Sequence, residues 1–172
     1  MTNTMVNEHL ITVDMFMKLT RPTSKHIDYG EVETFIRECE DLYIIPAIGL
    51  ERFKNLLRDR KEEKYIKLLD GGEYEDKEGT LKKCSGLRFA LSYFVYAKMI
   101  MSDGGLLTRT GLMQHNDSYA SREDDKNRVR RYNDVMEIAE TYLGSCLAFL
   151  KSVEGDKIKP VRGTRVRIHS IG

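Results

Sequence analysis

The chain has 172 residues, enough for one domain to bury roughly 70% of its unfolded surface, whereas two domains would each have a thin core. Its 28 basic and 27 acidic residues give a net charge of +1, which excludes a general polyanion binder and leaves nucleic-acid binding to a local basic patch. Cys39, Cys84 and Cys146 form no CxxC pair, and each lies in or beside an apolar helical pattern. We therefore expect reduced core thiols in a soluble cytoplasmic protein, since the N-terminal residues also show no signal-peptide pattern.

Two helices are predicted near the N-terminus. The first is a short helix within residues 10–19, which Thr12 or Asp14 can cap. Asp28 can cap the second, in which apolar residues recur at the spacing of one helical face as far as residue 43.

Proline and glycine divide the next part of the chain into short elements. Pro46 must end or kink the preceding helix, because its ring removes an amide donor, and Gly49 marks a second break. Short helices are expected over residues 50–57 and 65–69. The charged segment 73–83 predicts a small hairpin, with a turn near its middle.

The segment from Ser85 to Asp103 is apolar nearly all round, so other elements must surround it. A bilayer span needs about 20 apolar residues, and Lys98 interrupts a shorter run, which argues against a membrane helix. Ser85 can cap this helix and Gly104 can end it. We predict a mainly α fold, a helical bundle around a buried central helix at about residues 85–103, with small hairpin or strand elements in the loop and in a C-terminal arm.

The second half of the chain contains a long loop and one more helix. Residues 104–120 lack a helical pattern, and connections of this length are typically functional or disordered. Within this loop, residues 108–113 are expected to form a short strand. Ser121 and Asp124 can cap an amphipathic helix that runs to residue 150 and packs along the central helix. The predicted core residues are the inward-facing apolar positions Phe35, Ile36, Phe53, Leu87, Leu91, Phe94, Met136, Leu143 and Leu150.

Residues 156–172 are a basic arm that follows a helical domain of residues 1–155. We expect the arm either to belong to the same domain or to make a contact between subunits. Residues 166–168 alternate with the period of a strand. A single strand needs a partner, which is either the segment 106–113 or another chain. The arm either forms a charged, solvated edge, or adds a strand to a neighbouring subunit, or contacts nucleic-acid phosphates.

Candidate contacts with partners lie in the long loop and in the arm. The apolar loop residues either fold back onto the core of the chain or dock on another protein. The candidate interface residues are Leu106, Leu107, Arg109, Leu112, Met113, His115, Arg162, Arg165, Val166, Arg167 and Ile168.

Patterns that indicate chemistry are missing from the sequence. The four histidines lie in separate segments without metal-ligand spacing, and there is no GxSxG elbow, paired Cys/His motif or phosphate-binding loop. We predict no catalytic residue, no metal site and no cofactor, and hence a protein that is not an enzyme. A small enzyme remains an alternative only if its active-site residues come together from distant parts of the sequence.

Three stretches occur together in a recognisable order. Residues 43–57 read YIIPAIGLERFKNLL, residues 65–100 contain LLDGGEY and GLRFALSYFVYA, and residues 108–121 read TRTGLMQHNDSYAS before the last helix. Over roughly residues 10–150 the chain resembles the head–tail connector proteins of tailed bacteriophages (adaptor or head-completion proteins), in particular prophage-encoded versions. The shared motifs are structural and not catalytic.

The resemblance implies a non-enzymatic structural protein of the phage neck, located in the host cytoplasm during assembly and then in the virion neck. Such a protein forms a homo-oligomeric ring between portal and tail, in some cases only on the portal, and contacts the portal protein and tail or neck proteins. DNA passes through the ring without sequence reading, and no membrane is involved. The alternative is a small helical nucleic-acid-binding module that uses Lys159, Arg162, Arg165 and Arg167 of the arm.

Overall fold

The computed structural model of the chain describes residues 9–21, 27–102, 106–108, 111–113 and 125–155. Over these residues the fold is mainly α, as predicted. The elements in chain order are α1 (Val13–Leu19), α2 (Tyr29–Cys39), the π-helical turn η1 (Glu40–Ile44), α3 (Ile45–Ile48), α4 (Leu50–Arg58), α5 (Glu63–Asp70), β1 (Gly72–Glu75), β2 (Leu81–Cys84), α6 (Leu87–Ser102), β3 (Leu106–Thr108), β4 (Gly111–Met113) and α7 (Asp125–Glu154).

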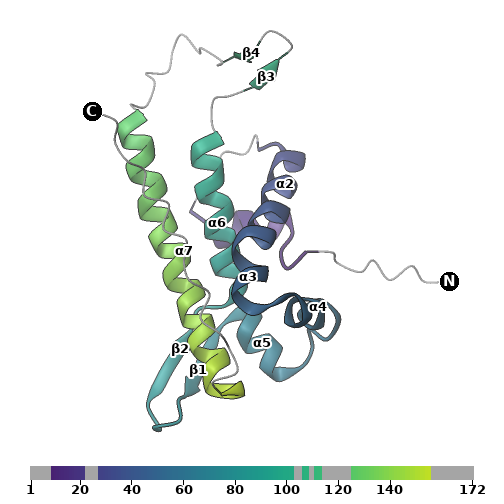
Figure 1. The fold of residues 1–172 in the computed structure, drawn as a ribbon, viewed down its shortest axis with the longest axis vertical. Coiled ribbons are helices and arrows are strands. Elements are labelled where there is room, and N and C mark those ends of the chain that lie inside the picture. The colour runs from purple at the N-terminus through teal and green to yellow at the C-terminus, as the bar shows by residue number, and fades with distance from the viewer. Residues whose placement is uncertain (1–8, 22–26, 103–105, 109–110, 114–124, 156–172) are drawn as a thin grey trace, which may run out of the picture.

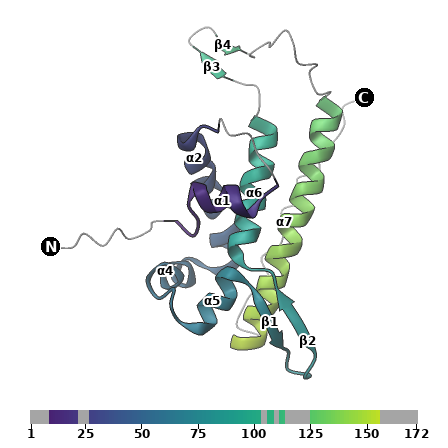
Figure 2. The ribbon, with the colours of Figure 1, turned by 180° about the vertical axis from the view of Figure 1, so that it is seen from behind.

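Helices α6 and α7 form the antiparallel pair around which the other elements are arranged (Figures 1 and 2). Tyr142 of α7 packs edge-on against Phe89 and Tyr93 of α6, at centroid distances of 6.3 and 5.4 Å. Helix α2, η1, α1 and α5 contact α6 as well, and Tyr43 of η1 stacks on Phe94 at 4.2 Å. The central helix is therefore enclosed on several sides, which explains why its sequence has almost no polar face.

The predicted core residues lie in or against one hydrophobic core. Six are buried, namely Ile36, Phe53, Leu87, Leu91, Phe94 and Leu150. Phe35, Met136 and Leu143 are partly buried and pack against the same core.

Local sequence signals place several element boundaries correctly. Thr12 caps α1, with its Oγ1 accepting a hydrogen bond from the Met15 amide, and Asp28 caps α2 by accepting from the amides of Gly30 and Glu31. The expected hairpin in segment 73–83 is formed by β1 and β2, which pair antiparallel.

Other boundaries differ from the prediction. The helical conformation does not end at residue 43, because the wide turn η1 leads directly into α3. Pro46 lies in the first turn of α3, where a residue needs no amide donor. Ser85 does not cap the central helix. Gly86 precedes the helix and its carbonyl accepts from the Ala90 amide at 3.2 Å, while the Ser85 amide donates to Ser145 Oγ at 3.0 Å.

The strand expected over residues 108–113 is instead a second hairpin, in which β3 and β4 pair with each other. Segment 106–113 thus has a strand partner within itself. Helix α7 extends to Glu154, four residues beyond the predicted end. Its predicted caps Ser121 and Asp124, Gly104 after α6, and the whole arm 156–172 lie outside the described residues.

Candidate interaction surface

The predicted interface residues are only partly described by the structure. Hairpin β3–β4 lies beyond the end of the bundle at which α6 ends and α7 begins (Figure 1). Its register pairs Leu106 with Met113 and Leu107 with Leu112. The other candidates, Arg109, His115, Arg162, Arg165, Val166, Arg167 and Ile168, lie outside the described residues.

The opposite end of the molecule, which we call the hairpin end, is formed by α4, α5, β1–β2 and the last turns of α7 (Figures 1 and 2). An ion pair between Arg52 of α4 and Glu154 of α7 ties two of these elements together. Four large apolar side chains are exposed here: Leu50 by 52%, Ile66 by 45%, Leu81 by 64% and Val153 by 53%. Exposed apolar side chains gathered at one end of a protein are typical of an interaction site.

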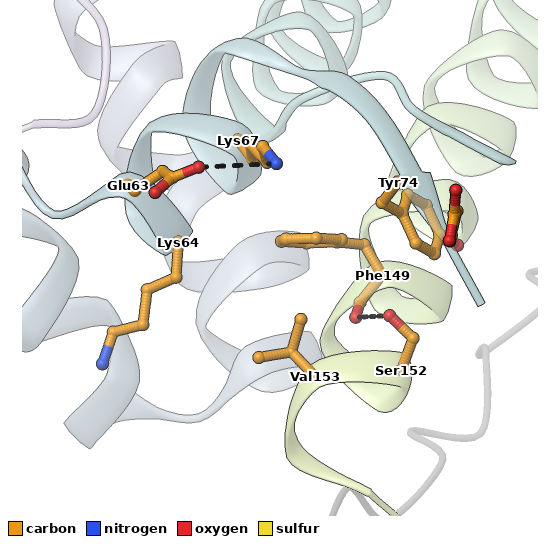
Figure 3. A pocket seen from close by; sticks show the side chains of 8 residues that line it. Glu63, Lys64, Lys67, Tyr74, Phe149, Ser152 and Val153 are labelled. Carbon is orange, nitrogen blue, oxygen red and sulfur yellow. Dashed lines mark hydrogen bonds and ion pairs between the residues drawn. The ribbon is translucent and has the colours of Figure 1, made fainter. Parts of the chain in front are cut away.

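A groove with a cavity volume of about 400 Å³ opens at the hairpin end (Figure 3). Tyr74 and Phe149 form its aromatic part and meet edge-to-face at a centroid distance of 5.0 Å. The lining residues come from α5, β1 and α7 and are Glu63, Lys64, Lys67, Tyr74, Glu75, Phe149, Ser152 and Val153. None of them was a candidate from sequence, because the groove brings together segments separated by more than 70 positions.

Four polar side chains of the groove are engaged with one another or with neighbours. Glu63 Oε1 lies 3.7 Å from Lys67 Nζ, and Lys64 Nζ lies 3.1 Å from Glu62 Oε2. Ser152 Oγ donates to the Phe149 carbonyl at 2.7 Å. Burial raises the pKa of the Tyr74 hydroxyl. An aromatic floor with paired charges at its rim suits a contact surface better than a reaction centre.

A buried polar cluster clamps the N-terminal segment onto the bundle. The buried carboxylate of Glu40, in η1, accepts from the Leu10 amide at 2.7 Å and lies 2.7 Å from His9 Nδ1. Arg60 donates to the His9 carbonyl and Arg88 to the Leu10 carbonyl. Burial raises the pKa of Glu40, and the hydrogen bonds from His9 and Leu10 oppose this shift. The cluster joins residues 9 and 10 to η1, Arg60 and α6, and we assign it a structural role.

The cysteines are buried free thiols, as predicted. Cys84 Sγ and Cys146 Sγ lie 3.7 Å apart, which the sequence did not indicate. Their contact lowers the pKa of Cys84, whereas the contact and burial together raise the pKa of Cys146. Burial raises the pKa of Cys39 to about 12.

The described part of the chain offers neither a metal site nor a membrane span. Within those residues, no three side chains of the His, Cys, Asp and Glu types are grouped so that they could hold a metal ion. No described helix combines the length and the apolar character that crossing a membrane requires.

Comparison with known proteins gives one match. The sequence model of DUF6712, described as a family of unknown function, matches residues 44–156. No curated protein and no solved structure matches the chain. The matched region runs from the end of η1 to just past α7, so it contains the groove, the hairpin end and the Cys84–Cys146 contact, but not His9 or Glu40.

Proposed function

Since the chain belongs to DUF6712, a family of unknown function, its role must be inferred from its own residues, and we propose that it is a non-enzymatic structural protein of the phage neck. In this proposal it forms an oligomeric ring between portal and tail during virion assembly. It is made in the host cytoplasm and ends in the virion neck, where DNA passes through the ring without sequence reading.

The proposal starts from the resemblance of residues 10–150 to head–tail connector proteins, and one observation on the structure supports it. Exposed apolar side chains occur on α4, α5, β2 and α7 at the hairpin end, and one of them, Val153, lines the groove with its aromatic floor. A closed ring needs a heterologous interface, in which two different patches of each subunit meet. The hairpin end is one such patch, and the β3–β4 hairpin at the opposite end is the second.

The way in which these surfaces are supported favours the same role. The hairpin end rests on the antiparallel pair α6–α7 and on α5, whose inward side chains are buried. A rigid body with two different contact surfaces can assemble into such a ring.

Capture on immobilised portal protein from the same phage or prophage tests the proposal. We expect the full chain to bind, and we expect Leu81→Gln to weaken capture roughly tenfold, as the loss of a central apolar contact does. Leu81 is chosen because it is the most exposed of the apolar side chains at the hairpin end.

Leu42→Gln is the matched control, because Leu42 is exposed by 56% but lies on η1, outside the hairpin end. It should bind as the unchanged chain does. Failure of the unchanged chain to bind the portal would contradict the proposed function. Equal binding by all three proteins would remove the hairpin end from the interface.

A further inference from the structure

We propose that Cys84 and Cys146 are an oxidisable pair, which a peroxide converts into a disulfide between β2 and α7. The two Sγ atoms lie 3.7 Å apart although the residues are 62 positions apart in the sequence. A disulfide needs a sulfur–sulfur distance of about 2.0 Å, so a short approach of the two side chains is sufficient.

The backbone around Cys84 holds the two thiols opposite each other. The amide of the next residue, Ser85, donates to Ser145 Oγ at 3.0 Å, so neighbouring residues link the same two segments. On the other side, the carbonyls of Cys84 and Ser85 lie close to Gly71. A Cβ added at Gly71 would be 2.8 Å from the Cys84 oxygen and 2.7 Å from the Ser85 oxygen. The end of β2 is therefore held between α7 and the end of α5, which keeps Cys84 beside Cys146.

The reaction with hydrogen peroxide balances in two steps. The Cys84 thiolate attacks one peroxide oxygen, the O–O bond breaks, and hydroxide leaves and takes up a proton to give water and a sulfenic acid. The Cys146 sulfur then attacks the Cys84 sulfur, loses its proton, and displaces the sulfenic oxygen as a second water. Two thiols are oxidised to one disulfide, and one peroxide is reduced to two waters.

The environment of the pair decides which cysteine reacts and with what. The lowered pKa of Cys84 favours its thiolate, which is the reactive form. Both thiols are buried, so the oxidant has to be small, and peroxide is close to water in size. Cys39 is also buried, but its pKa is raised to about 12, which disfavours the thiolate and makes it an internal control.

The consequence of the disulfide depends on the proposed function. Inside a host cell the thiols stay reduced, whereas a released particle meets oxidants. The bond would close a loop that contains all of α6 and would attach β2 to α7 permanently. Because α7 lines the groove together with β1, the strand that pairs with β2, oxidation would lock the hairpin end in the shape that its partner binds.

Peptide mass spectrometry on the purified full chain tests the proposal. The reduced protein is treated with hydrogen peroxide at neutral pH, unfolded and alkylated with iodoacetamide. We expect a peptide pair joined through Cys84 and Cys146, with Cys39 alkylated. Loop closure should also raise the melting temperature by roughly 5–10 °C, and dithiothreitol should reverse the rise.

Three variants separate this bond from other oxidation products. Cys84→Ser and Cys146→Ser should each lose the rise in melting temperature, whereas Cys39→Ser should keep it. Alkylation of Cys84 and Cys146 in the peroxide-treated wild type, or a bond from either of them to another chain, would overturn the proposal. Portal capture is measured separately for the reduced and the oxidised wild type. If the portal captures neither form, the neck role is contradicted but the disulfide is not.

Discussion

Hairpins β1–β2 and β3–β4 are both two-stranded and antiparallel, but their surroundings differ. Hairpin β1–β2 lies against the body of the molecule, where Tyr74 packs on Phe149 of α7 and Cys84 is buried beside Cys146. Hairpin β3–β4 lies beyond the ends of α6 and α7 (Figures 1 and 2). A two-stranded hairpin is marginally stable in water by itself, so the first owes its stability to the helices, whereas in the proposed function the second contacts a neighbouring subunit.

Loss of the aromatic contact should produce the largest change in stability. Phe149→Ala removes a buried ring that holds β1 on α7, and we expect it to lower the free energy of unfolding by about 3–4 kcal/mol in urea titrations. Val153→Ala, on the same helix but exposed, should change it by less than about 0.5 kcal/mol. If the two variants had similar stabilities, the packing of β1–β2 on α7 would not be what supports this hairpin.

A methyl group at Gly86 should be nearly as harmful. Gly86 has a φ of 97°, and a Cβ there would lie 2.7 Å from the carbonyl oxygen of Leu69. We expect Gly86→Ala to cost about 2–3 kcal/mol, because it strains the connection between β2 and α6. Gly144→Ala is the control, since Gly144 is helical with open space around it and alanine should stabilise α7 by about 0.5–1 kcal/mol. A neutral Gly86→Ala would show that β2 can move away from α5 without cost.

The turn of β1–β2 should show a smaller, pH-dependent effect. Asp76 accepts from the amides of Glu78 and Thr80 at 2.9 Å and pairs with Lys82, and these contacts lower its pKa below 3.8. A carboxylate whose pKa is lowered by folding stabilises the folded state at pH values above its ordinary pKa. This stabilisation is lost as the pH falls through the pKa that the group has in the folded state. Wild type should therefore be more stable than Asp76→Asn at neutral pH, and the difference should shrink in urea titrations below about pH 4.

Glu73→Gln controls for the loss of one negative charge, because Glu73 belongs to the same hairpin but not to its turn. A constant difference between wild type and Asp76→Asn from pH 7 to pH 3 would contradict the role of Asp76 in the turn.

Much of this architecture could be predicted from sequence because its signals are local. The caps Thr12 and Asp28, the break at Gly49 and the hairpin in 73–83 each depend on residues within a few positions. The central helix was identified because burial on several sides requires an apolar sequence without a polar face.

The features that local patterns could not show depend on distant residues. Glu40 reads as one more charged position of an amphipathic helix, but it follows Ile36 by four residues on the buried face, where it meets His9, 31 positions away. The Cys84–Cys146 contact and the groove likewise arise only when α7 packs back along the chain. The cap assigned to Ser85 was wrong because α6 begins at Leu87, so Gly86 and not Ser85 is the residue before the helix.

Electron microscopy of purified portal mixed with the full chain tests the central claim, the neck role, most directly. We predict a ring of added density beneath the portal. With a flexible Gly/Ser linker in place of residues 103–124 the ring should be lost because β3–β4 is removed, while the free energy of unfolding should stay within about 1 kcal/mol, since every residue of the described core is kept. Bare portal at saturating amounts of the unchanged chain would contradict the neck role, and a ring formed equally well by the linker variant would contradict the role given to β3–β4.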